Sequence, residues 1–107
     1  MYAAVSNKLS VVNGVDQFSS AVAMSGSNAA RVEFTIFANS ATSLSIDLQG
    51  SNDLQNWAIV GSAHTGYVVG YNSFAETAVS FQFVRLRQYV VGTGTVIIAA
   101  GINTAAL

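Results

Sequence analysis

Polar and apolar residues alternate in two neighbouring segments of the chain, ARVEFTIFAN (30–39) and SLSIDLQG (43–50). A period of two puts successive side chains on opposite faces of a β-strand, so that one face can be buried while the other meets solvent. The intervening SAT is short enough for a hairpin. The one stretch worth testing for a helical turn or two is DQFSSAVAM (16–24). The pattern therefore predicts antiparallel strands.

Strand-like segments recur along the rest of the chain: NWAIVGS (56–62), HTGYVVGYNSFAET (64–77), FQFVRLRQYV (81–90) and TVIIAAGI (95–102). About seven or eight short strands at roughly ten-residue spacing indicate an all-β fold, an antiparallel β-sandwich with jelly-roll or related Greek-key topology. No linker divides the chain. We expect residues 1–107 to form one domain, in which residues 1–15 are an N-terminal arm able to order on a partner.

Charged residues are scarce. The chain has four basic and five acidic residues, 8% of its length, against about 25% in ordinary soluble domains. Such a composition suits either a membrane protein or a protein whose surface is covered by partners. A membrane span needs about 20 consecutive apolar residues, and TVIIAAGI is far shorter. We therefore expect a surface covered by other subunits, and no membrane partner.

The placement of the basic residues and the start of the chain narrow the partners further. Lys8, Arg31, Arg85 and Arg87 are scattered along the sequence, whereas a nucleic-acid binder concentrates its basic residues on one face. The first residues, MYAAVSNKLSVVNG, lack the basic and apolar regions of a secretory signal. We expect no nucleic-acid partner, and synthesis in the cytoplasm without a signal peptide.

The strand faces that should meet solvent also carry apolar residues. If Val84, Leu86 and Val90 face the core, the residues between them face outward together. A contiguous apolar surface usually marks a contact site, and guanidinium groups at such a site stack on rings and pair with carboxylates. The alternative is that residues 1–30 cover these faces. The predicted interface consists of Phe37, Phe81, Phe83, Arg85, Arg87, Tyr89 and Ile97.

The stretch GSND (50–53) has the residues of a tight turn. Glycine adopts positive φ without strain, and Ser, Asn and Asp side chains hydrogen-bond to nearby backbone groups. The turn separates SLSIDLQG from the strand that contains Trp57. We predict a structural corner formed by Asn52, Asp53 and Trp57.

Catalytic chemistry has few candidates. There is no cysteine, and His64 is the single histidine, so one chain can form neither a thiolate site nor a histidine cluster for a metal. No Gly-x-Ser-x-Gly motif accompanies His64. Asp47 and Asp53 could share a calcium ion, but an outward strand position and a turn favour structural roles. We expect no enzyme activity, no metal and no cofactor.

The long segment 64–77 offers an alternative site. Its aromatic side chains could form a platform on which sugar rings stack, with a histidine beside them. The residues of this alternative ligand loop are His64, Tyr67, Tyr71 and Phe74.

Three motifs occur in order: L-x-G-S-N-D-x-x-x-W (48–57), FVRLR (83–87) and GTGTV (92–96). Over residues 30–102 this order resembles the small β-sandwich modules of tailed-bacteriophage virion proteins, of the head decoration or cement type. Discoidin-like, sugar-binding sandwiches share a looser version. The resemblance implies that the Ser-Asn-Asp turn joins two strands and that Trp57 packs over the end of the core. Trp57→Ala would then cost about 3–5 kcal/mol.

The same resemblance implies a non-enzymatic virion structural protein, made in the host cytoplasm. Head decoration proteins bind the major capsid protein, often as trimers, so we expect a homo-oligomer, with a trimer favoured, that stabilises the capsid lattice. Tail and baseplate proteins carry similar modules. The alternative is therefore a carbohydrate- or receptor-binding module of a phage tail or adsorption device, which would use the loop of His64 and its aromatic neighbours.

Overall fold

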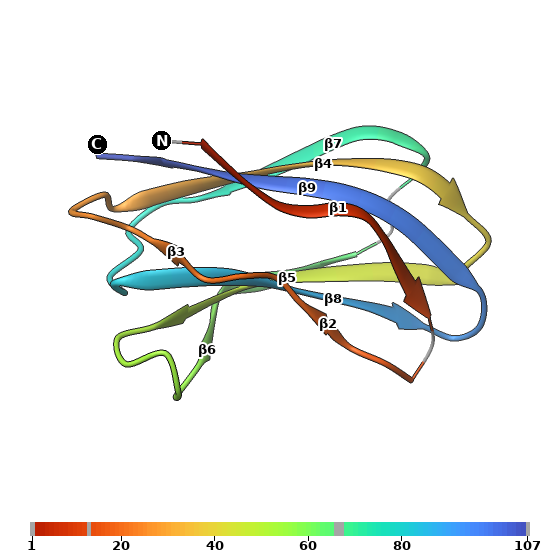
Figure 1. Ribbon diagram of the computed structural model, residues 1–107, viewed down its shortest axis with the longest axis horizontal. Helices are drawn as coiled ribbons and strands as arrows, with labels where there is room; N and C mark the ends of the chain where they lie inside the picture. The colour runs from red at the N-terminus through yellow and green to blue at the C-terminus, as the bar shows by residue number, and fades with distance from the viewer. Residues whose placement is uncertain (1, 13, 66–67, 107) are drawn as a thin grey trace.

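The alternating segments form β-strands that lie in two layers (Figure 1). The computed structural model describes residues 2–12, 14–65 and 68–106. Within these ranges the strands are β1 (Tyr2–Val12), β2 (Gln17–Phe18), β3 (Val22–Ala23), β4 (Ala29–Asn39), β5 (Ser43–Ser51), β6 (Ala58–Thr65), β7 (Gly70–Glu76), β8 (Phe83–Val91) and β9 (Thr95–Ala105).

The two layers are antiparallel sheets with a jelly-roll order. Sheet A has the order β1-β9-β4-β7, and sheet B has the order β2-β8-β5-β6. The short strands β2 and β3 pair with different parts of β8, at Phe18↔Arg87 and Val22↔Val84, so they share one strand position. With these two counted as one, the orders become 1-8-3-6 and 2-7-4-5, as in a jelly roll. This confirms the predicted all-β sandwich. The stretch DQFSSAVAM (16–24), the candidate for a helical turn, instead contains the strands β2 and β3.

The β4–β5 connection is not the hairpin that its length predicts. β4 lies in sheet A and β5 in sheet B, so the linker carries the chain from one layer to the other. Apolar side chains on strands in opposite sheets bury each other. Two strands joined as a hairpin lie in one sheet, so their apolar side chains would still need a second layer to cover them. The β8–β9 connection crosses beside it: the backbone N–H of Thr42 donates to Thr93 O, and that of Ser40 donates to Thr95 O, both at 3.0 Å.

The N-terminal segment is a strand of sheet A and not a free arm. β1 pairs antiparallel with β9 at the edge of the sheet. Val11 is buried, and Ala3, Val5 and Leu9 pack against the core. On the other layer, β2 and β3 pair with β8. The N-terminal residues therefore extend both sheets instead of covering their outer faces.

Both sheets contribute to one hydrophobic core. β4 and β9 of sheet A and β5 and β8 of sheet B each contribute a row of buried side chains. The buried side chains from these strands include Val32, Phe34, Ile36, Leu44, Ile46, Leu48, Val84, Leu86, Val96, Ile98 and Ile102. Among the described residues, no helix is long and apolar enough to cross a membrane.

Two phenylalanines on β4 give a matched test of this core. Phe34 is 1% exposed and Phe37 is 49% exposed. We expect Phe34→Ala to lower the free energy of unfolding by about 3–5 kcal/mol, because it leaves a cavity. Phe37→Ala should cost less than about 1 kcal/mol. Urea denaturation of both variants measures the difference, and equal costs would contradict the arrangement of the strand.

Candidate functional site

The outer face of sheet B gathers arginine and aromatic side chains. Val84, Leu86, Gln88 and Val90 of β8 are buried, so the residues between them point outward. The register places Gln49 of β5 and other side chains of neighbouring strands on the same face, since paired residues share a face. The outward set comprises Phe18, Asp47, Gln49, Ile59, Phe83, Arg85, Arg87 and Tyr89.

Arg85 contacts two aromatic rings. Its guanidinium carbon is 4.3 Å from the ring centroid of Phe18 and 4.1 Å from that of Trp57. Its Nε donates a hydrogen bond to Oε1 of Gln49 at 2.8 Å. Partial burial lowers the pKa of Arg85, although a guanidinium stays charged in proteins. Stacking on two rings therefore holds a cation in one orientation at the surface.

Arg87 is instead neutralised within the chain. Its Nε and Nη2 both contact Oδ2 of Asp16 at 2.9 Å, and its Nη1 donates to Oδ2 of Asp47 at 3.1 Å. The hydrogen bond to Asp16 is the main reason that the pKa of Arg87 is raised. Its guanidinium also lies 4.1 Å from the ring centroid of Tyr89. Oδ1 of Asp47 is buried and has no hydrogen-bond partner.

The residues predicted as one interface lie in three places. Phe83, Arg85, Arg87 and Tyr89 share the outer face of sheet B. The ring of Phe81 lies over Gly50 at one end of the sandwich, where a Cβ on Gly50 would overlap it. The other two predicted residues, Phe37 and Ile97, belong to β4 and β9 of sheet A. The grouping is therefore wrong, because the outer faces of a sandwich point in opposite directions.

Several residues of the sheet B face were missed by the sequence prediction. Asp16 and Phe18 lie in the stretch tested for a helical turn, and they reach Arg87 and Arg85 only because β2 pairs with β8. Gln49 meets Arg85 through the β5–β8 register. No local signal in the sequence indicates these pairings.

The corner between β5 and β6 is a network of side-chain to backbone hydrogen bonds. Oγ of Ser51 accepts from the N–H of Asp53 at 3.2 Å and of Leu54 at 2.9 Å. Oδ1 of Asp53 accepts from the N–H of Gln55 at 2.9 Å and of Asn56 at 2.8 Å. These donors hold the pKa of the Asp53 carboxyl well below its usual range, those of Asn56 and Gln55 most of all.

Asn52 ties this corner to the chain before β8. Its Oδ1 accepts a hydrogen bond from the backbone N–H of Gln82 at 2.9 Å. Asn52 thus ties the corner to a distant segment, and Asp53 holds the loop itself through hydrogen bonds to its backbone. The shape of the corner is set by polar contacts and not by apolar burial.

Trp57 does not pack over the core as expected. It is half-buried, it lies outside the core cluster, and its ring stacks on Arg85. Trp57 does lie on the same face as Ile59, as the alternation predicts. This face is the outer one, however, and Ile59 is 50% exposed. The sequence correctly pairs these two residues on one face and misassigns which face it is.

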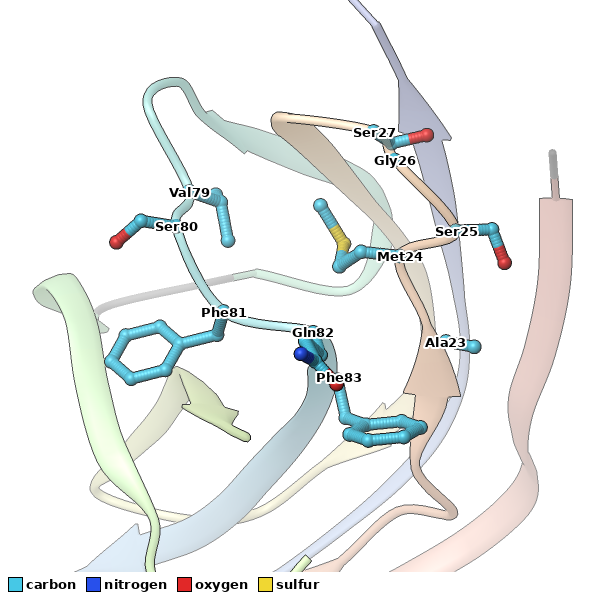
Figure 2. Close-up of a pocket in the computed structure, with 10 residues that line it drawn as sticks. All are labelled: Ala23, Met24, Ser25, Gly26, Ser27, Val79, Ser80, Phe81, Gln82 and Phe83. Carbon is cyan, nitrogen blue, oxygen red and sulfur yellow. The ribbon is translucent and has the colours of Figure 1, made fainter. Parts of the chain in front are cut away.

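Two hollows flank Phe81 at the end of the sandwich that holds the corner. One, of about 540 Å³, lies between the β3–β4 turn and the segment before β8. Figure 2 shows the Met24 side chain pointing toward Val79, with the hydroxyls of Ser25 and Ser80 directed outward. The second, of about 300 Å³, is lined by Trp57 and by the polar corner residues. The first hollow is therefore a gap between loops with an apolar floor.

The alternative ligand loop does not assemble as predicted. His64 and Phe74 stack on each other, with 3.8 Å between ring centroids, and Nε2 of His64 lies 3.0 Å from Oε1 of Glu76. These three side chains lie between β6 and β7, the edge strands of the two sheets. Tyr71 is 63% exposed and donates to Oε1 of Glu33 at 2.9 Å, and Tyr67 lies outside the described residues. His64 and Phe74 are therefore occupied by each other and offer no platform.

The described ranges hold no group of three or more His, Asp or Glu side chains that could bind a metal. A scan against family models and a search of curated proteins found no match. A search of solved structures matched the crystal structure of the SPBc2 prophage-derived protein YomS, with a TM-score of 0.63 and 11% sequence identity. The match covers 98% of this chain and 92% of that chain. At this identity the likeness shows the fold alone.

The Asp53 corner predicts a pH-dependent stability. Because folding lowers the pKa of Asp53, its contribution is complete above the ordinary carboxyl pKa of 3.8 and is lost as the pH falls toward the folded value. We expect Asp53→Asn to destabilise the protein by a constant amount between about pH 7 and pH 5, and by less at lower pH. Denaturation of both proteins from about pH 7 to about pH 2 measures the difference. A difference that stays the same below about pH 4 would contradict the prediction.

The position of Trp57 predicts a modest cost for its removal. Trp57→Ala removes a half-buried ring and one cation–π contact, so it should cost about 1–2 kcal/mol. Leu86→Ala, at a fully buried position next to Arg85, should cost about 2–5 kcal/mol. Urea denaturation followed by far-UV circular dichroism compares the two. Equal costs would return Trp57 to a core role.

Proposed function

We propose that this chain is a non-enzymatic structural subunit of a bacteriophage particle, a capsid decoration protein that binds the particle through the outer face of sheet B. The observation that carries the proposal is the row of stacked cations and rings on this face, in which Phe18 is 48% exposed and Ile59 is 50% exposed. Aromatic residues and arginines of this kind dominate the energetics of protein interfaces.

Three further observations support a structural role. YomS, a protein derived from the SPBc2 prophage, has a similar fold over nearly its full length. His64, the single histidine of the chain, contacts Glu76 and Phe74 between the sheets. The polar side chains that are most constrained, those of the corner and of Arg87, hold the fold together.

The outer faces of the two sheets differ in how their charged groups are paired. On sheet A, Arg31 lies 3.6 Å from Glu33 and donates to Ser73, and Tyr71 also contacts Glu33. These polar groups satisfy one another at the surface. The face of sheet B combines exposed rings with a cation that lacks a carboxylate partner among the described residues. We therefore assign the contact with the particle to the outer face of sheet B. Copies of the chain would form an oligomer around a capsid site, and the resemblance to head decoration proteins favours a trimer.

The test uses particles of the phage or prophage that encodes the chain. Mass spectrometry of purified particles should detect it, and the purified protein should bind saturably to particles from which its gene has been deleted, as measured by co-sedimentation. Phe18→Ala should weaken this binding about tenfold, as expected for a residue at the centre of an interface. Light scattering of the free protein measures its self-association separately.

Phe37→Ala is the matched control. Phe37 is the same residue type with almost the same exposure, 49%, and it lies on sheet A. Its removal should leave particle binding unchanged. Absence of the chain from particles, or equal effects of the two variants, would overturn the proposal.

A further inference from the structure

The five acidic side chains of the chain are all engaged within it. Two contact the same arginine, one is bound by corner N–H groups, one by a histidine, and one by an arginine and a tyrosine. They are Asp16 and Asp47 with Arg87, Asp53 in the corner, Glu76 with His64, and Glu33 with Arg31 and Tyr71.

Arg85 is the exception among the arginines. Its Nε donates to the uncharged Gln49, and no described carboxylate lies within ion-pair distance of it. Arg85 is half-buried, so part of its side chain reaches solvent. The rings of Phe18 and Trp57 both contact the guanidinium, with their centroids 4.3 Å and 4.1 Å from its carbon.

We propose that Arg85 binds a carboxylate, an Asp or Glu side chain on a different protein of the particle. This inference rests on the proposed function and names the chemistry of the partner. The guanidinium presents two parallel N–H groups that match the two oxygens of a carboxylate. The two rings hold this group in place before binding, so little side-chain freedom remains to be lost on association.

The charge inventory indicates that the carboxylate comes from another protein and not from a second copy. Each acidic side chain of a second copy already has a partner, and taking one would break a contact such as Asp16–Arg87 or Glu33–Arg31. A carboxylate from a different protein removes no such contact. It also compensates the partial desolvation that the rings impose on Arg85.

The first experiment uses sodium acetate as the probe. The full chain is titrated at constant ionic strength, with sodium chloride replaced by acetate, while NMR follows the side-chain Nε–H signals of the arginines and the indole signal of Trp57. We expect saturable shifts for Arg85 and Trp57, and none of comparable size for Arg31 or Arg87. Arg85→Lys keeps the charge but loses the fork, and it should weaken acetate binding about tenfold.

Arg31→Lys is the matched control for Arg85→Lys, because Arg31 already contacts Glu33 on sheet A. It should leave acetate binding unchanged, and the backbone spectrum of each variant reports whether it is folded. The proposal is overturned if the Arg85 signals respond no more than those of Arg87, or if chloride produces the same shifts.

A second arm separates two sources of carboxylate. A blocked Gly-Glu-Gly peptide and trigalacturonate are compared at equal carboxylate concentration. Tighter binding of the peptide supports a carboxylate on a protein partner. Tighter binding of trigalacturonate overturns the protein partner and indicates an acidic glycan instead. If particle binding depends on Phe18 but acetate does not bind, this inference alone fails. If acetate binds but the chain is absent from particles, the proposed function fails and the protein source fails with it.

Discussion

The burial of the apolar rows of the two sheets in one shared core is the constraint on which the rest of the structure depends. β4 and β5 adjoin in sequence, but each lies in a different sheet, and the apolar rows of both belong to this core. Burial of such rows is the main favourable contribution to folding, at about 25 cal/mol per Å² of apolar surface. Because side chains alternate along a strand, burying one row also determines which residues face outward. Because Val84 and Leu86 of β8 are buried, Arg85 and Arg87, which alternate with them, face outward.

The scarcity of charge has a different meaning in the structure than in the sequence. The composition predicts a surface covered by partners, yet most of the few charged groups are used in contacts within the chain. Arg87 of β8 bridges Asp16, which precedes β2, and Asp47 of β5, and Asp47 is nearly fully buried. Arg85 contacts two rings and lacks a carboxylate among the described residues. An arginine that lacks a carboxylate partner and lies on an aromatic face is a more specific indication of a partner than low overall charge.

Local polar chemistry holds the regions that the core does not reach. The corner after β5 depends on Ser51 and Asp53, whose oxygens accept backbone N–H groups within a few residues. The opening between β6 and β7 is occupied by the stacked rings of His64 and Phe74 and by Glu76. Gly61, at φ +72°, allows this approach, because a Cβ there would overlap the Glu76 carboxylate. These contacts make residues that look available for ligands part of the fold.

The sequence alone determined strands β4 to β9, the inward rows of β4, β5 and β8, and the turn chemistry of Asn52 and Asp53. Each of these depends on a period of two or on hydrogen bonds between near neighbours, which a short segment carries by itself. Only the tertiary structure decided that β4 and β5 lie in opposite sheets, that Phe37 and Ile97 face away from Arg85, and that Trp57 stacks on a cation outside the core. Alternation shows that two residues share a face, but not which face is covered. That assignment depends on which distant strand buries each row, and it is settled only when both layers are in place.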